Sequence, residues 1–371
     1  MKLKKLVSLG VSTLLIASMA LTGCGANQTT KTDENTNTNN ASAPAEQTTE
    51  ADKQLFVEIV AKGFQHDFWQ AVLQGTEKAA KELNVATNFV GPANESAIAE
   101  QVEQLNNAIN KNPDAIALAA LDTSAAIDSI STAQSKGIPI VGFDSGVPGA
   151  PEGAVVANAS TNNYKAGELA AENMYEAIKD KVTNPSSSVR IGVVAQEANS
   201  ESITQRTAGF VEKITTLIGE DKVAVIGHEK YAKANDSAKV IIEVRIPTEV
   251  ADNAGKTEAL TLLNKEDLIG IYGSNEFAAK CIINANEGMN KLGVDKVIAI
   301  GFDAGALQLD AVRSGVFYGS ITQNPVAIGY YAVKLAVDAA NGQPVSDVDT
   351  GCLFYNAENM DSEEIAVCLY E

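Results

Sequence analysis

Aromatic residues and histidines are scarce in this sequence. Phe, Trp and Tyr make up 5% of the 371 residues, with a single tryptophan, Trp69, and only two histidines, His66 and His228. Two histidines and a few scattered cysteines do not give the ligand spacing of a metal site. We therefore expect no metal and no cofactor, and no catalytic site built on them.

Positive charge is scarce as well. Lys and Arg number 28 against 47 Asp and Glu, so the formal net charge is −19 and the sequence pI is near 4.6. Such acidity argues against nucleic acid as a partner and is typical of a soluble protein with an acidic surface. Glycine-rich phosphate loops are also missing, because the sequence has no GxGxxG after its first predicted strand and no GxxxxGKS.

Cysteine occurs four times, at Cys24, Cys281, Cys352 and Cys368. Cys352 and Cys368 flank the C-terminal segment and could form a disulfide in an oxidising exterior. The sequence does not decide between this disulfide and two free thiols. Cys281 lies in a helical pattern, where a free cysteine is typical of a small buried residue.

The N-terminal segment has the pattern of a lipoprotein signal peptide, predicted over residues 1–23. Three lysines within the first five residues precede the apolar run Leu6–Leu21, which is too short for a comfortable membrane span. The run ends in Leu-Thr-Gly-Cys24, which resembles a bacterial lipobox and implies cleavage and lipidation at Cys24. An ordinary signal peptide that contains Cys24 by chance is the alternative. Residues 24–54 are rich in Asn, Thr and Gln without apolar periodicity, which predicts a lipidated cysteine followed by a disordered tether.

From residue 55 onward, short apolar strand patterns alternate with amphipathic helix patterns. Alternation of this kind predicts right-handed βαβ units and parallel sheets. The pattern pauses at residues 155–163, restarts, and is irregular over residues 231–255. The predicted fold is therefore α/β, with two doubly wound, Rossmann-like lobes rather than one oversized sheet. Strands are predicted at 55–60, 85–90, 115–119, 139–143, 189–194, 223–227, 268–272, 297–301 and 319–322, and helices at 68–83, 96–110, 124–136, 164–178, 202–218, 276–292, 306–313 and 325–340.

The stretch of residues 55–72 carries suggestive chemistry. A predicted strand ends in a loop with Lys62 and His66, and Phe68 and Trp69 then open a helix. Such a loop lies at the carboxyl edge of a parallel sheet, where open α/β sheets bind their ligands. Aromatic faces beside hydrogen-bonding side chains suit a ligand with apolar C–H faces and many hydroxyls, such as a sugar. The alternative is that both aromatic residues belong to the core.

Six short motifs, in this order along the chain, resemble those of the type I periplasmic sugar-binding proteins, and most of all the ribose-binding type. The resemblance implies two α/β lobes with the ligand in the cleft between them. Three chain crossings would join the lobes near residues 159–161, 323–324 and 352–353. One lobe would then comprise residues 55–160 plus 324–352, and the other residues 161–323 plus 353–371. The motifs are KGFQHDFW (62–69), GFDSG (142–146), QRTAGF (205–210), YGSNE (272–276), IGFDAG (300–305) and ITQNP (321–325).

The same resemblance implies a set of ligand-binding residues. The aspartates of the repeated GFD would accept bonds from sugar hydroxyls, an arginine would donate a planar fork, and the aromatic pair would stack on the ring. A surface turn, a surface salt bridge, a helix cap and a core position are the alternatives for individual members. Glu197 is a weaker candidate. The expected set is Lys62, His66, Phe68, Trp69, Asp144, Arg206, Asn275, Phe302, Asp303 and Gln323.

One position departs from the ribose-type pattern. Where that pattern has an arginine after the first aspartate, this sequence has Ser145, so Lys62 or His66 would supply the replacement positive charge. The irregular region 231–255 also covers the segment that normally places an aromatic residue over the cleft. Ribose itself is therefore doubtful, and another pentose, a hexose, a polyol or a furanose-like signal molecule fits as well.

These features together predict a monomeric solute-binding lipoprotein, anchored by lipid on the extracellular face of a Gram-positive type of membrane. It would capture a monosaccharide or polyol by closure of its lobes and deliver it to the permease subunits of an ABC transporter. The alternative is a sensor that presents its ligand to a membrane receptor. A transcriptional regulator with the same lobes would carry an N-terminal helix-turn-helix, where this sequence has the signal-peptide pattern. An enzyme acting on sugars would need an acid–base pair or a metal and is not expected.

Overall fold

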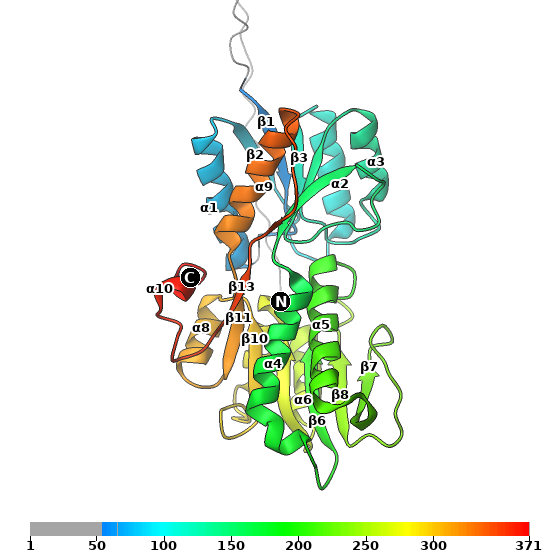
Figure 1. Ribbon diagram of the computed structural model, residues 1–371, viewed down its shortest axis with the longest axis vertical. Coiled ribbons are helices and arrows are strands. Elements are labelled where there is room, and N and C mark those ends of the chain that lie inside the picture. The colour runs from blue at the N-terminus through cyan, green and yellow to red at the C-terminus, as the bar shows by residue number, and fades with distance from the viewer. Residues whose placement is uncertain (1–53, 65, 371) are drawn as a thin grey trace, which may run out of the picture. The chain divides into compact units, whose positions relative to one another are not determined.

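The computed structural model describes residues 54–64 and 66–370, and they form two sheets with helices packed against both (Figure 1). The predicted signal peptide, the lipidation at Cys24 and nearly all of the predicted tether lie outside the described residues. Within the described ranges, no helix combines the length and apolar character needed to cross a bilayer.

The first sheet, sheet A, has the strand order β12-β5-β4-β3-β1-β2, and all its pairings are parallel. Its central strands are short runs of Val, Ile, Ala and Leu, which suit a sheet buried on both faces. The strands are β1 (Phe56–Val60), β2 (Ala86–Val90), β3 (Ala115–Leu118), β4 (Ile140–Phe143), β5 (Val155–Ser160) and β12 (Val348–Asp349). The helices of this lobe are α1 (Asp67–Glu82), α2 (Ile98–Asn110), α3 (Ile127–Ser135) and α9 (Pro325–Ala340).

The second sheet, sheet B, has the order β13-β11-β10-β9-β6-β8-β7 and is parallel except for the pairing of β13 with β11. Its strands are β6 (Val189–Val194), β7 (Val223–Gly227), β8 (Val240–Arg245), β9 (Leu268–Gly273), β10 (Ile298–Phe302), β11 (Gly319–Gln323) and β13 (Cys352–Tyr355). The helices are α4 (Asn163–Val182), α5 (Glu201–Ile218), α6 (Asp252–Leu263), α7 (Glu276–Asn286), α8 (Ala306–Arg313) and α10 (Glu363–Ala366), with a 3-10 turn at Glu220–Lys222.

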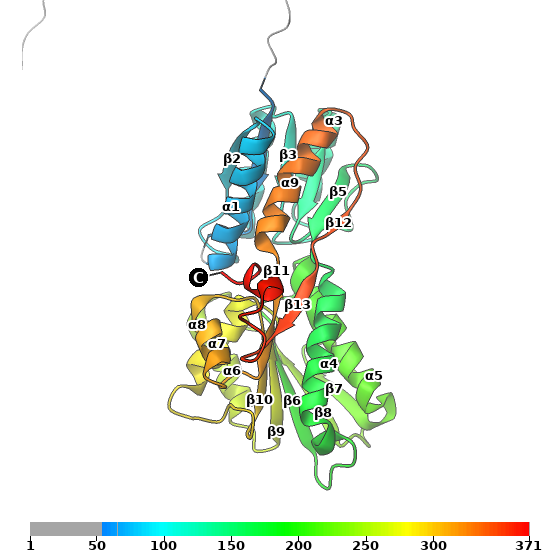
Figure 2. The ribbon, with the colours of Figure 1, turned by 60° about the vertical axis from the view of Figure 1, so that its left-hand side comes forward.

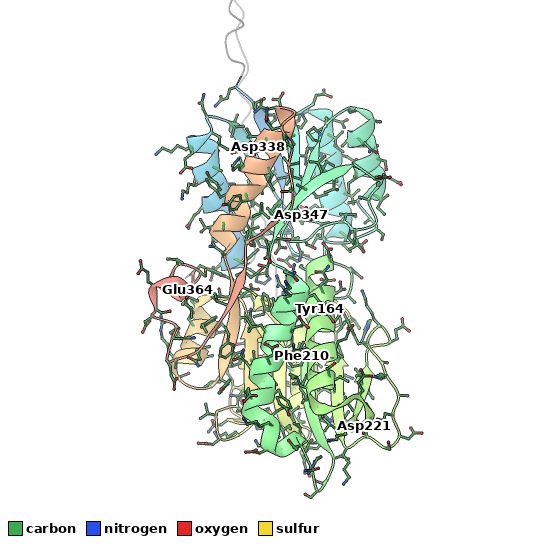
Figure 3. The ribbon with its side chains drawn as sticks, viewed as in Figure 1. Tyr164, Phe210, Asp221, Asp338, Asp347 and Glu364 are labelled. Atoms are coloured by element: carbon green, nitrogen blue, oxygen red, sulfur yellow. The ribbon has the colours of Figure 1, made fainter. Side chains whose placement is uncertain are left out.

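The chain passes between the two sheets three times: from β5 to α4, from β11 to α9, and from β12 to β13. Aspartates fix two of these passages to each other. The carboxylate of Asp347, labelled in Figure 3, accepts the backbone N–H of Asn158 at 2.8 Å. That of Asp349 accepts the N–H groups of Asn162 at 3.1 Å and Gly351 at 2.9 Å. Cys352, which the sequence analysis put at the end of the first lobe, is the first residue of β13 and pairs with β11 in sheet B.

Each lobe contains one pair of helices in very close contact. In the lobe of sheet A, α1 lies beside α9 (Figure 2), and a Cβ atom at Gly75 would stand only 2.1 Å from the carbonyl oxygen of Val326. In the other lobe, α4 lies beside α5, and a Cβ atom at Gly209 would be 2.1 Å from the carbonyl of Tyr164. Glycine is needed at both contacts because the backbones approach too closely for any side chain. The two lobes therefore use the same packing device.

The predicted fold class is confirmed, and most predicted helices and strands agree with the structure to within a few residues. The predicted pause at residues 155–163 is wrong, because β5 forms there. Ala157 and Asn158 are poor strand formers by themselves, and pairing with β4 overrides that preference. The predicted helix 276–292 is too long. It ends at Asn286, whose side-chain oxygen accepts the N–H groups of Lys291 and Leu292.

The region 231–255 contains β8 and the start of α6, and β8 is inserted between β6 and β7. The twelve-residue connection from β7 to β8 contains no helix, which is why its sequence showed no helical period. The three cysteines of the described chain are free thiols, so Cys352 and Cys368 form no disulfide with each other in this structure. Cys281 is fully buried in α7, as its helical pattern predicts.

Candidate functional site

A small cavity of about 20 Å³ lies between the two sheets, at the carboxyl ends of their parallel strands. This edge is the expected location of a ligand site in an open α/β sheet, and with the lobes this close together the cavity is much smaller than the pockets that hold small ligands. The walls come from the loops after β1, β2, β4, β9 and β10, from the end of β11 and from the first turns of α1 and α5. The lining residues are Lys62, His66, Phe68, Trp69, Glu95, Asp144, Ser202, Ile203, Arg206, Asn275, Glu276, Asp303 and Gln323.

The structure brings nine of the ten candidate residues to the walls of this one cavity. Phe302 is the exception, because its ring is fully buried and does not line the cavity. It supports Arg206 from behind, with the guanidinium carbon 3.9 Å from the ring centroid. The weaker candidate Glu197 also lies elsewhere. Its carboxylate accepts bonds from the backbone N–H groups of Asn199 and Ser200, just before α5.

Phe68 and Trp69 line the cavity and also pack in the core. Phe68 is 6% exposed and Trp69 is 2% exposed, and their rings meet edge to face with centroids 5.0 Å apart. Trp69 makes a second edge-to-face contact with Phe143, which belongs to the core of sheet A. The sequence analysis treated core and ligand site as alternatives for this pair. The structure packs both residues in the core and also places their rings at the cavity wall.

Glu95 joins the two lobes through hydrogen bonds. One carboxylate oxygen accepts the indole N–H of Trp69 at 2.7 Å, and the other accepts from the side-chain amide of Gln196 at 2.7 Å. Gln196 in turn accepts from Asn275 at 2.6 Å, and Asn275 caps the first turn of α7 through the N–H of Ala278. Asn275 therefore caps a helix, which was the alternative to ligand binding at this position, and it also lines the cavity. The chain of bonds holds the lobes in a closed arrangement.

Asp144 and Asp303 occupy matching positions after β4 and β10, and both have a left-handed backbone, with φ of 54° and 76°. Aspartate tolerates this conformation better than most residues, and it turns each carboxylate away from the strand toward the cavity. Asp303 accepts the side-chain amide of Gln323 at 2.7 Å and the backbone N–H of Glu276 at 3.0 Å. The repeated GFD thus places one carboxylate from each sheet at the cavity.

Arg206 stands between these two aspartates. Its terminal nitrogens lie 3.9 Å from Asp144 and 3.9 Å from Asp303. Its Nε atom donates to the side-chain oxygen of Asn163 at 2.7 Å, and its guanidinium stacks on Phe302. The bond to Asn163 and the contact with Phe302 hold the guanidinium in one plane. Its remaining N–H donors then keep fixed directions, which suits oxygen acceptors of a ligand.

Lys62 provides a second cation at the position where the departure at Ser145 removes one. Its ammonium nitrogen lies 3.9 Å from Asp144 and 3.9 Å from Glu95. The Ser145 hydroxyl accepts the backbone N–H of Ser202 at 3.3 Å, which forms a hydrogen bond between the two lobes next to Lys62. The positive charge near Asp144 thus comes from Lys62 and Arg206.

Burial acts strongly on the titratable groups of the cavity. It lowers the pKa of His66, although Glu95 opposes the effect, so this imidazole is mainly neutral at pH 7. Burial also raises the pKa of Asp144 against the opposing effects of Lys62 and Arg206. For Glu95 the balance is reversed: burial raises its pKa, but Lys62, His66 and the bonds from Gln196 and Trp69 outweigh burial, and the pKa is lowered.

Comparison with known proteins identifies the family. A family model described as a periplasmic binding protein domain matches residues 57–344, which is most of the chain. The chain belongs to the periplasmic binding protein family. This match confirms the resemblance carried by the six motifs.

Two solved structures and a protein similar in sequence support the same assignment for this periplasmic binding protein. An ABC transporter protein of Brachyspira murdochii, described as a LacI family transcriptional regulator, is 37% identical with a TM-score of 0.72, covering 86% of this chain and 99% of its own. A solute-binding protein of Agrobacterium vitis with bound D-fucose is 27% identical with a TM-score of 0.73, covering 85% and 100%. The ribose import binding protein of Bacillus subtilis is 22% identical over 79% of this chain and 84% of its own. The relatives are named for binding, transport or regulation, and this chain is a binding protein rather than an enzyme.

Four cavity residues of this binding protein were not among the candidates: Glu95, Ser202, Ile203 and Glu276. Glu276 stands inside the quoted YGSNE motif, next to Asn275, and could have been found there. Glu95 follows β2 at the same sheet edge as the other loops, and its position after a strand was the available signal. An acidic residue just before a helix is often explained by the helix dipole, so this signal alone does not identify a cavity residue.

Glu276 has a strongly perturbed carboxyl group at the cavity wall. Burial raises its pKa to about 8, and the negative charges of Asp303 and Asp67 add to the effect. Because this pKa exceeds the ordinary value of 4.5, the folded protein holds the proton more tightly than the unfolded chain does. The stability linked to this proton is fully present below about pH 4.5 and is lost as the pH rises through about 8.

Replacing Glu276 with glutamine is expected to remove this pH dependence. Between about pH 5 and about pH 9, the melting temperature of Glu276→Gln should fall less than that of the unchanged protein. The difference should correspond to about a few kcal/mol in the free energy of unfolding. Differential scanning calorimetry over this range measures the effect. Glu220→Gln is the control, because Glu220 is exposed and pairs with Lys233 on the surface of the same lobe. If the curves of Glu276→Gln and Glu220→Gln run parallel, Glu276 does not carry the raised pKa.

Proposed function

We propose that this protein is the solute-binding component of an ABC importer for a monosaccharide or polyol. The observation that carries the proposal is the arrangement of Asp144 and Asp303, one carboxylate from each sheet, on either side of the Arg206 guanidinium. Carboxylates and a planar donor fork can together satisfy both the donors and the acceptors of neighbouring hydroxyl groups. The relative with bound D-fucose and the relative named for ribose import support a sugar as the class of ligand.

Recognition by this cavity would combine polar and apolar contacts. The rings of Phe68 and Trp69 offer aromatic faces and edges for the C–H side of a sugar ring. Lys62, Arg206, Asn275 and Gln323 supply donors, and the carboxylates supply acceptors. Because these groups come from both lobes, a ligand gains its full set of bonds only when the lobes close on it.

Closure would be a hinge motion at the three passages between the sheets. We propose one lobe on each side of a hinge near residues 160–163, 323–325 and 349–352. These passages lie close to the crossings predicted from the sequence near residues 159–161, 323–324 and 352–353. In this reading the mature protein is a monomer, held at the outer face of the cell membrane through a lipid on Cys24. It would hand the bound solute to the permease subunits of the transporter.

A binding screen tests the proposed function. Purified protein is mixed with neutral pentoses, hexoses and polyols, and the melting temperature is measured for each. At least one should raise the melting temperature, and the fluorescence of Trp69, the only tryptophan, should change with the same ligand because its indole N–H bonds to Glu95 at the cavity wall. Absence of any stabilisation, confirmed by calorimetry over the whole screen, would show that the protein is not a binding protein for neutral sugars or polyols.

A further inference from the structure

The formal charges of the cavity do not balance. Its walls carry four carboxyl groups but only two fixed cations, Lys62 and Arg206. Each cation lies between two carboxylates: Lys62 near Glu95 and Asp144, and Arg206 near Asp144 and Asp303. The seventh titratable group of the walls, His66, is mainly neutral at pH 7 because burial lowers its pKa. A buried excess of negative charge is unfavourable unless a cation or a proton compensates it.

The excess negative charge is concentrated at one end of the cavity. This end is formed by Glu276, Asp303 and Gln323 and is here called the acidic end. Asp303 connects the other two, since it accepts the backbone N–H of Glu276 and the side-chain amide of Gln323. The ion-pair partner of Glu276 within 4.0 Å is His66, at 3.8 Å, and in the described part of the chain no lysine or arginine lies that close. The positive charge of Lys62 lies beside Glu95 and Asp144 instead.

The acidic end also contains unused hydrogen-bond acceptors. Oε1 of Gln323 is buried without a hydrogen-bond partner, in a side chain that is 2% exposed and lines the cavity. Oε2 of Glu276 is likewise buried without a partner. Buried polar atoms normally have a hydrogen-bond partner, so we expect a ligand to donate hydrogen bonds to both oxygens. A hydroxyl group would supply one donor, whereas an ammonium group supplies three together with the missing positive charge.

We propose that the ligand of this cavity is a sugar or polyol that carries a protonated amine, and that the amine binds at the acidic end between Glu276, Asp303 and Gln323. This inference rests on the proposed function, because it specifies the class of ligand for the same cavity. The uncharged hydroxyls of the ligand then face the Lys62 and Arg206 side, where each cation is already matched by carboxylates. The raised pKa of Glu276, caused by burial and then by the negative charges of Asp303 and Asp67, agrees with this assignment.

Matched pairs of ligands test the inference. The purified protein is titrated by calorimetry with D-glucosamine, D-galactosamine and D-mannosamine and with their parent sugars, at about pH 6.5, where an amine with the basicity of an α-amino group is protonated. Each pair differs by an ammonium group in place of one hydroxyl. At least one amino sugar should bind about ten- to one-hundred-fold more tightly than its parent, as expected for a hydrogen-bonded ion pair in a buried site.

Two variants locate the effect. Glu276→Gln keeps the shape of the side chain and should abolish the preference for the amino sugar while the protein still binds the parent. Glu220→Gln, at an exposed position, should leave the preference unchanged. If neutral sugars bind and no amino sugar binds more tightly, the inference is wrong and the proposed function stands. If Glu276→Gln keeps the full preference, the amine does not bind at the acidic end. If neither amino sugars nor neutral sugars and polyols bind, both proposals are wrong.

Discussion

Replacing Asp303 with asparagine is expected to abolish the stabilisation of this protein by its ligand and to leave the apo protein folded. Asparagine accepts the left-handed backbone found here, with φ of 76°, so the loop after β10 should keep its path. The change removes the negative charge and puts an N–H₂ group where a carboxylate oxygen now accepts a bond. Both oxygens of Asp303 are engaged, one by Gln323 and the other by the backbone N–H of Glu276, so one of these donors would face another donor.

The expected loss of affinity is about one-hundred-fold or more, the effect of removing a charged acceptor from a buried set of hydrogen bonds. Calorimetric titration with the best ligand of the screen measures it, and circular dichroism of the apo protein checks the fold. Asp310→Asn is the control, because Asp310 lies on the exposed face of α8 in the same lobe, with a side chain 79% exposed. If Asp303→Asn binds the ligand as tightly as the Asp310→Asn control, Asp303 has no part in the site.

Most of the architecture was predictable because the sequence repeats one local pattern. Short runs such as Phe56–Val60 and Val189–Val194 are flanked by helical periods, and the rules for βαβ units then fix parallel pairing. The order of strands in sheet B was not predictable, because β8 enters between β6 and β7 after a loop without periodicity. The strand β5 was missed since its residues become extended only by pairing with β4.

Part of the candidate site could also be predicted from the sequence. Carboxyl ends of parallel strands gather at one edge, so residues directly after a strand, such as Asp144, Asp303 and Gln323, could be grouped without coordinates. Contacts across the cleft had no such signal. Nothing in the sequence relates Glu95 to Gln196, which bonds to it from the other lobe, 101 positions later. The orientation of Phe302 toward the guanidinium of Arg206 rather than the cavity also depends on how β10 packs against α5.

The central position of Arg206 leads to the second large effect. Replacement by alanine is expected to weaken ligand binding about one-hundred-fold or more and to oppose closure of the lobes. Without the guanidinium, Asp144 and Asp303 would approach each other from the two sheets with no cation between them, and like charges in a buried cavity repel strongly. The change also removes the bond to Asn163 and the contact with the Phe302 ring. Arg206→Lys should be intermediate, because it restores the charge without the planar fork.

Calorimetry gives the affinity, and small-angle X-ray scattering with and without ligand reports whether the lobes still close. The matched control is Arg190→Ala, which removes another largely buried arginine with two carboxylate partners, Glu243 at 2.6 Å and Asp267 at 3.0 Å. Arg190 stands at the amino end of β6, away from the strand ends that form the cavity. Its loss should lower the melting temperature and leave the affinity unchanged. If Arg206→Ala lowers only the melting temperature, as the control does, then Arg206 serves the fold alone and the carboxylates of the two sheets bind ligand without it.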